Sequence, residues 1–245
     1  MHNTNRKLFN MICAMLASAF LAQVLAACNN DNGAVSPSST TKLLVINTSP
    51  DIGPVAAFSN NAQIGKGSEV NVAARTYFRY ATIPAYYGIG TGALTLQLRT
   101  PILGTILSSD TITTAANKTY SLFLVGLLSV DSLSSVMLRD TAALPARGNG
   151  KIRFLNASPR TPALDVYVNG TLGFTKIKYK GVSPFIEVPA GVYDFKLTAN
   201  GAPTSILTDL QRTTILDGKI YTLYSKGLVG RTDTAAISLN VITNK

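Results

Sequence analysis

The chain has very few of the residue types on which common enzyme and metal sites depend. It contains no tryptophan, one histidine (His2), and two cysteines, Cys13 and Cys28, both near its amino terminus. Triad catalysis needs an imidazole beside its nucleophile, and ordinary zinc sites need imidazole or thiolate ligands. The sequence also has no Walker loop, dinucleotide fingerprint or EF-hand loop. It therefore predicts no catalytic residue, no metal and no cofactor.

Charged residues are scarce as well, at 14% of the 245 residues, whereas 46% are hydrophobic. Together with 19 glycines and 11 prolines, this composition favours packed β structure over helix or disorder. The net charge of +10 is compatible with acidic partners. However, the basic residues are spread along the chain instead of gathering with aromatics, so we expect no nucleic-acid partner.

The first 27 residues have the features of a secretion signal. Arg6 and Lys7 precede the apolar stretch 11–22, which is too short for a comfortable transmembrane helix. The tetrapeptide Leu25–Cys28 follows and resembles the bacterial lipobox. That resemblance implies cleavage before Cys28, lipidation of its thiol and acylation of the new amino group, which anchors the protein stably in a lipid bilayer. An ordinary signal peptide with a chance cysteine is the alternative.

Residues 28–41 are polar and contain glycine, serine and proline, which predicts a flexible tether. Asn29 carries no strong inner-membrane retention signal, so we expect an outer-membrane lipoprotein. Periplasmic and surface display both remain open. Removal of residues 1–27 leaves 20 basic and 12 acidic residues, a net charge of +8.

From Lys42 onward the chain repeats itself. KLLVINTSP at 42–50 matches KIRFLNASP at 151–159, and NKTYSLFLVGL at 117–127 matches DGKIYTLYSKGL at 217–228. Between them, PVAAFSNNAQIG, which starts at Pro54, matches PALDVYVNGTLG, which starts at Pro162. We therefore predict two copies of one domain, residues 42–140 and 151–245, with a linker at 141–150.

Each copy contains about seven short predicted strands separated by turns, a spacing that is typical of a β-sandwich. Asn169-Gly170 is a strong hairpin signal, and Asn60-Asn61 is a weaker form of it. The segment Asn156–Pro159 predicts a polar elbow between two half-buried strands. The predicted fold class is all-β, with two tandem antiparallel sandwiches of immunoglobulin or transthyretin type. In the second copy we expect strands at 151–156, 163–168, 171–176, 184–188, 192–199, 205–215, 219–226 and 235–242.

The second copy resembles a bacterial family, domain-of-unknown-function family 4397. The resemblance depends on the order of four segments: Asn156–Pro159, Leu164–Gly170, Val188–Tyr193 and Gly218–Thr222. It implies a secreted or envelope β-sandwich module, often in tandem, and it transfers no catalytic residues. The first copy matches more loosely, since it has Ala57 in place of the aspartate and an insertion at 86–92.

Carboxylates are the remaining candidates for chemistry, because a pair of them can hydrolyse a glycosidic bond. The chain has only two glutamates, Glu69 and Glu187, and ten aspartates. Asp165 stands within a predicted strand, where an acid needs solvent or a partner. It is either a catalytic candidate, with Glu187, or a residue that faces solvent or caps the elbow.

Two groups of side chains are candidates for a contact surface. Lys176, Lys178 and Lys180 alternate, so in an extended segment they share one face and can contact phosphate or anionic sugar. Alternatively, the three lysines form a solvent-exposed strand face or prevent edge-to-edge pairing with another sheet. Four tyrosines gather around the insertion of the first copy, either as a stacking surface or as core packing, and they are Tyr77, Tyr80, Tyr86 and Tyr87.

Four triplets resemble the Asp-Ser/Thr-apolar sequon for O-glycosylation in Bacteroidetes-type envelopes. Aspartate and threonine also favour turns, which is the alternative explanation. The acceptor residues of these triplets are Thr111, Ser132, Thr141 and Thr234.

Taken together, these features predict a non-catalytic envelope lipoprotein that acts as a binding, adhesion or spacer module. Its expected partners are an envelope polysaccharide, another envelope protein or a second copy of itself. A carboxylate-based glycan hydrolase is the alternative.

Overall fold

The computed structural model describes residues 41–65, 78–80, 85–130 and 132–244. Within these ranges the regular elements are β-strands and the short 3-10 helix η3 (Leu128–Val130). No helix among them is long and apolar enough to cross a membrane. The predicted signal sequence, Cys28 and the predicted tether up to residue 40 lie outside the described residues, and so does Glu69. Thr41 is buried and its hydroxyl donates to the Ala115 carbonyl at 2.9 Å, so the prediction of a flexible tether is wrong at this residue.

The strands of the predicted first copy are β1 (Lys42–Asn47), β2 (Ala56–Ser59), β3 (Ala62–Gln63), β4 (Tyr87–Gly88), β5 (Gly92–Arg99), β6 (Ile106–Thr114), β7 (Thr119–Val125) and β8 (Ser134–Arg139). They form two sheets with the orders β4-β1-β7-β8 and β3-β2-β5-β6. We call these the inner and outer sheets of the first repeat.

The second repeat has the same plan. Its strands are β9 (Asn149–Asn156), β10 (Leu164–Val168), β11 (Thr171–Ile177), β12 (Ile186–Pro189), β13 (Gly191–Ala199), β14 (Ile206–Ile215), β15 (Ile220–Lys226) and β16 (Ser238–Thr243). Its inner sheet is β12-β9-β15-β16 and its outer sheet is β11-β10-β13-β14. The fold class is confirmed: the chain is all-β, with two tandem β-sandwiches.

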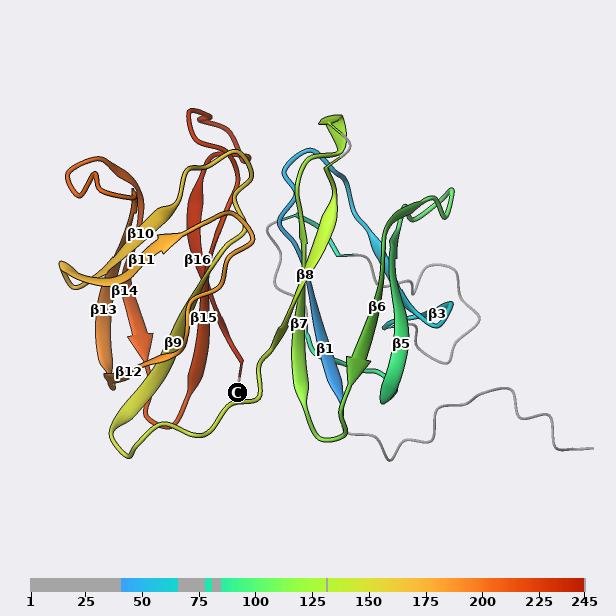
Figure 1. Cartoon of the computed structure of the whole chain (residues 1–245), viewed down its shortest axis with the longest axis horizontal. Coiled ribbons are helices and arrows are strands. Elements are labelled where there is room, and N and C mark those ends of the chain that lie inside the picture. Colours follow the sequence, from blue (N-terminus) through green and yellow to red (C-terminus); the bar gives the residue numbers. More distant parts are fainter. Residues whose placement is uncertain (1–40, 66–77, 81–84, 131, 245) are drawn as a thin grey trace, which may run out of the picture. The chain divides into compact units, whose positions relative to one another are not determined.

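Most strand pairs are antiparallel, but each inner sheet contains one parallel pair at its centre. Strand β1 pairs in parallel with β7, and β9 pairs in parallel with β15, as can be followed in Figure 1. The long connection from β1 to β7 contains the whole outer sheet of that repeat, which is the kind of crossover that parallel strands require. The elbows that end β1 and β9 therefore lie at the same end of their sheets as the turns that end β7 and β15.

Each sandwich has its own core between its inner and outer sheets. In the first repeat, Leu43 and Val45 of β1 face Leu94, Leu96 and other residues of the outer sheet. In the second repeat, Ile152 and Phe154 of β9 pack in the same way with Phe195. The alternation of side chains along each strand places every second residue in these cores.

The other faces of the inner sheets form a third cluster, which joins the two repeats. Leu44 and Phe123 from the first repeat are in this cluster with Leu155 and Tyr224 from the second, and the rings of Phe123 and Tyr224 lie 5.3 Å apart. The prediction that the strand before the Asn156–Pro159 elbow is half-buried is therefore wrong, because β9 is buried on both faces from Ile152 to Asn156. Strands buried on both faces consist of continuous apolar runs such as LLVI in β1.

Matching contacts in the two halves support the repeat. The side-chain oxygens of Asn47 and Asn156 each accept the backbone N–H two residues later, at 3.1 Å, which closes the elbow. The hydroxyl groups of Tyr120 and Tyr221 each accept the backbone N–H five residues earlier, also at 3.1 Å. These contacts place the two elbows, and Tyr120 and Tyr221, at equivalent positions of the two repeats.

The predicted alignment is wrong by one position after the elbow. Ala57 and Val166 lie opposite Leu98 and Leu197 in the two outer sheets, so Ala57 corresponds to Val166. The counterpart of Asp165 is thus Ala56. The hairpin turns agree with this shift, because Asn60 and Asn169 each accept a backbone N–H at 2.8 Å from the strand beside them.

Candidate functional site

Four exposed cations of the second repeat lie at its elbow or close to it in the fold. Arg160 lies within the elbow, and Lys176, Lys178 and Lys180 lie at the end of β11 and just after it. All four are exposed. We call this group the basic elbow.

The backbone of the basic elbow is not the extended segment that the alternation of the lysines predicts. Lys176 and Lys180 have φ angles of 58° and 64°, in the left-handed region, and β11 ends at Ile177. Three hydrogen bonds hold this conformation: Lys176 N–H donates to Asp165 at 2.9 Å, Lys180 N–H to the Asn156 carbonyl at 2.8 Å, and Gly181 N–H to the Lys178 carbonyl at 2.8 Å. The lysines therefore project from a fixed turn.

Asp165 is a structural residue of this turn. It is 3% exposed, and its carboxylate accepts hydrogen bonds from the Lys176 and Gly201 N–H groups and from the Asn200 amide, at 2.9–3.1 Å. Burial alone would raise the pKa of Asp165, but these donors outweigh it and hold the pKa below its usual value. The carboxylate thus ties β10 to the turns that follow β11 and β13.

Glu187 lies on the inner sheet, in β12, and is also bound to groups of its own chain. Its carboxylate accepts the Ala146 N–H at 3.1 Å and lies 3.2 Å from the Lys151 ammonium. The Ala146 N–H and the Lys151 ammonium lower the pKa of Glu187. The structure therefore places the two predicted carboxylates on different sheets, each with its own partners. In the described ranges, no three histidine, cysteine, aspartate or glutamate residues are grouped so as to hold a metal.

The tyrosines that were candidates for a contact surface have contacts inside the molecule. Tyr87 is partly buried and packs edge-on against Phe78, with ring centroids 5.9 Å apart. Tyr80 lies beneath the Lys226 ammonium, which is 4.5 Å from its ring centroid. Tyr86 packs against the third cluster. Tyr77 lies outside the described residues.

A buried polar network at the junction of the repeats was not predicted. Asp140 is fully buried and forms an ion pair with Arg153 at 2.6 Å. It also accepts hydrogen bonds from the hydroxyl groups of Tyr86 at 2.7 Å and Ser121 at 2.6 Å. Burial raises the pKa of Asp140, against the lowering effect of these donors. We call this group, with Thr222 and Asn244, the inter-repeat network.

Arg153 connects the inter-repeat network to both inner sheets. It donates to the Arg139 carbonyl at the end of β8 and to the Thr222 hydroxyl of β15, both at 2.9 Å. The Thr222 hydroxyl in turn donates to Asn244 at 2.7 Å. One signal in the sequence marks this site: Arg153 interrupts an apolar strand at the position where the first repeat has Leu44. A buried arginine requires an anionic partner, but the sequence does not identify which one.

The four predicted glycosylation acceptors differ in accessibility. Thr111, in β6, Ser132, and Thr234, in the turn before β16, are exposed, whereas Thr141 is partly buried. The Ser132 hydroxyl donates to the Leu127 carbonyl at 3.2 Å, and the Thr141 hydroxyl accepts the Thr119 N–H at 2.8 Å. The hydroxyl groups of these two acceptors are already used within the fold.

Comparison with known proteins identifies the repeat. The family model described as "Domain of unknown function (DUF4397)" matches residues 41–167 and again residues 150–245. No curated protein matches the chain in sequence.

Two solved structures also match the chain, at low similarity. One is a family CBM26 module of Eubacterium rectale Amy13K in complex with maltoheptaose, with 11% identity and a TM-score of 0.27 over 81% of this chain and 96% of that one. The other is the Bacillus anthracis TIE protein, with 13% identity and a TM-score of 0.19 over 84% of this chain and 43% of that one. TM-scores this low carry no argument about this chain.

Proposed function

The chain belongs to the DUF4397 family, and from this premise we propose that it is a non-catalytic, lipid-anchored binding or spacer module of the bacterial cell envelope. The lipobox-like Leu25–Cys28 and the polar tether support the anchor. An outer-membrane location is part of the proposal. The expected partner is an envelope polysaccharide, a second envelope protein or another copy of the chain.

The observation that carries the non-catalytic part is the environment of the two candidate carboxylates. A glycosidase needs two carboxyl groups that face each other across the scissile bond. Asp165 instead accepts two backbone N–H groups and an amide within its own outer sheet, and Glu187 accepts the Ala146 N–H at the inner sheet. Both carboxylates accept hydrogen bonds from groups that stabilise the fold, and they lie on different sheets. This arrangement supports a binding role over a hydrolytic one.

The experiment begins with native protein extracted from envelopes in a nonionic detergent. Its intact mass is expected to match a chain that begins at an acylated Cys28, and affinity capture from the same extract is expected to retain a specific glycan or protein. A panel of envelope glycans incubated with the protein should remain uncleaved. Glycan cleavage that is lost in Glu187→Gln would instead establish the hydrolase alternative.

A further inference from the structure

The basic elbow is unusual in its uncompensated charge. Between Asn156 and Pro184 the chain has four cations and one acid, Asp165. Asp165 is buried, and its oxygens accept three donors of the fold. None of the four cations takes part in a described ion pair, whereas Arg231, in the turn after β15, is paired with Asp233.

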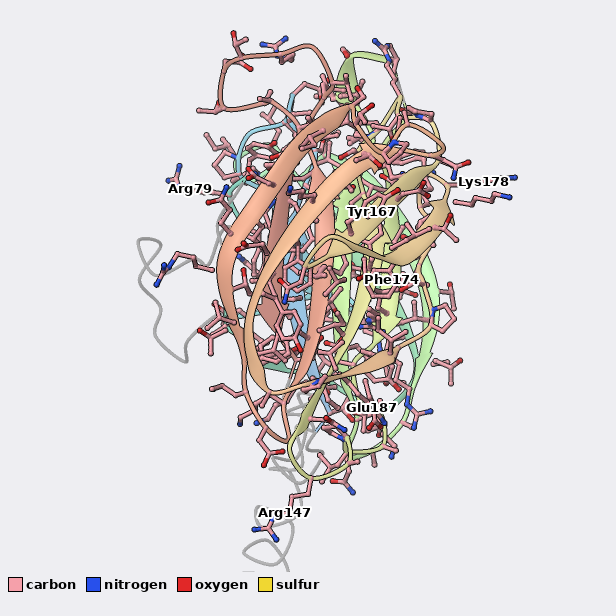
Figure 2. All side chains as sticks on the ribbon, turned by 90° about the vertical axis from the view of Figure 1, so that its left-hand side faces the viewer. Arg79, Arg147, Tyr167, Phe174, Lys178 and Glu187 are labelled. Carbon is pink, nitrogen blue, oxygen red and sulfur yellow. The ribbon has the colours of Figure 1, made fainter. Side chains whose placement is uncertain are left out.

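The four cations are brought to one end of the sandwich by strand register. Ile177 of β11 pairs with Leu164, the first residue of β10, so the end of β11 returns to the elbow that contains Arg160. The hydrogen bond from Lys180 to the Asn156 carbonyl fixes the following turn against the same elbow. Figure 2 shows Lys178 at one end of this sandwich, with Glu187 and Arg147 toward the other.

Neighbouring acids do not neutralise this end. The nearest exposed acids of the outer sheet, Asp194 and Asp209, lie on β13 and β14, whereas β11 is at the opposite edge of that sheet. The Asp194 carboxylate is also occupied, since it accepts the Arg212 N–H at 2.8 Å.

The first repeat shows that the elbow does not require a cation at the position of Arg160. By the register of the repeats, Asp51 occupies the position of Arg160. The Asp51 carboxylate accepts the N–H groups of Leu128 and Ser129, both at 2.9 Å, and caps η3. The same elbow therefore has a structural acid in one repeat and an unpaired cation in the other.

We propose that the basic elbow is a binding site for an acidic polysaccharide, an inference that rests on the proposed role as an envelope binding module. A single exposed ion pair is weak in water, so an isolated small anion would bind weakly to any one of these side chains. A polymer with regularly spaced carboxylates engages several cations at once, and each additional contact is intramolecular. Duplex nucleic acid fits less well, because about 6–10 phosphate contacts are typical and this site offers four cations.

The test compares two variants of the full chain in nonionic detergent, with polygalacturonate as the probe and neutral dextran as the blank. The patch variant carries Arg160→Asn, Lys176→Asn, Lys178→Gln and Lys180→Asn, because asparagine tolerates the positive φ angles at three of these positions. The control variant removes four cations at the opposite ends of the inner strands, by Lys42→Gln, Lys118→Gln, Arg147→Gln and Lys219→Gln.

We expect polygalacturonate to bind the wild-type chain with an affinity that falls as salt is raised. The patch variant should bind at least about tenfold more weakly, from the loss of several surface ion pairs, and the control variant within about twofold of wild type. Equal weakening in both variants would overturn the inference, because net charge alone would then explain binding. Tighter, patch-dependent binding of a short duplex DNA would overturn it as well. If polygalacturonate does not bind but a neutral glycan or a protein is specifically captured, the basic elbow is not a site for an acidic polysaccharide. The proposal that the chain is a binding module would then still stand.

Discussion

Removal of Arg153 is expected to be among the most destabilising single changes in this chain. The guanidinium group donates to Asp140, to Thr222 and to the Arg139 carbonyl, and the Asp140 side chain is 0% exposed. In Arg153→Met, Asp140 would retain only the hydroxyl groups of Tyr86 and Ser121 as donors. The change therefore leaves a buried carboxylate without a compensating charge.

The magnitude follows from the burial of the pair. Breaking a buried ion pair by removing one partner costs about 3–5 kcal/mol. Asp140→Asn removes the charge but keeps an acceptor for Tyr86 and Ser121, so the double variant Arg153→Met/Asp140→Asn should be less destabilised than the sum of the single variants by about 2 kcal/mol. Since burial raises the folded-state pKa of Asp140, and losing Arg153 raises it further, protonation favours the folded state. The penalty in Arg153→Met should thus shrink as the pH is lowered from 7 toward 5.

The assay is urea unfolding of the four chains of this cycle at both pH values, followed by tyrosine fluorescence and circular dichroism. Arg231→Met is the matched control, because it breaks an ion pair whose side chains are about half exposed, and its unfolding midpoint should not change. A loss below about 1 kcal/mol in Arg153→Met, or purely additive effects in the double variant, would refute the idea that the inter-repeat network is a buried, coupled unit.

Further predictions concern the glycine turns, the stability of the fold at acidic pH and the glycosylation of the chain. Gly227→Ala should destabilise the chain by about 2 kcal/mol, because a Cβ there meets the Ala236 carbonyl at 2.2 Å, whereas Gly230→Ala, with a similar φ and open space, should cost less in the same urea assay. Asp165→Asn should lower the free energy of unfolding by about 2 kcal/mol at pH 7, from the loss of charge-assisted hydrogen bonds. The lowered pKa of Asp165 means that its contribution is fully present above its ordinary value of 3.8 and is lost as the pH falls through the lower folded-state pKa, so the gap between wild type and variant should narrow as the pH is lowered below 3.8, and a constant gap would contradict the assignment. If the source organism glycosylates such sequons, peptide mass spectrometry should find sugar at Thr111 or Thr234 before Ser132 or Thr141, and a native mass that fits the acylated polypeptide alone would reject modification.

The strands of the second repeat could be predicted closely from its sequence. The predicted strand 192–199 corresponds to β13 at Gly191–Ala199, and 171–176 corresponds to β11 at Thr171–Ile177. Hairpin chemistry at Asn169-Gly170 and the alternation in β13 are local signals, which need no knowledge of distant contacts.

The relation between the repeats could not be predicted, because it depends on which faces pack together. The apolar residues of β1 fill both of its faces, yet a short apolar run has no period that distinguishes one buried face from two. The members of the inter-repeat network come from elements far apart in the chain: Tyr86, which donates to Asp140, lies before β4, and Thr222, which accepts from Arg153, lies in β15. Sequence spacing alone does not bring these groups together.

The basic elbow was predicted only in part. The three lysines could be found by their alternation, but the positive φ angles at Lys176 and Lys180 depend on Asp165 and Asn156, which bind the backbone of the turn. Arg160 joins them through the register of β10 and β11, which a sequence pattern does not contain.

Differential scanning calorimetry of the full chain tests the central claim most directly, namely that the two sandwiches form one body through the third cluster and the inter-repeat network. We predict a single transition in which the calorimetric and van't Hoff enthalpies agree, since neither inner sheet can lose its partner without exposing an apolar face. Two separate transitions, each with about half of the total enthalpy, would contradict the claim and would show that the repeats unfold independently.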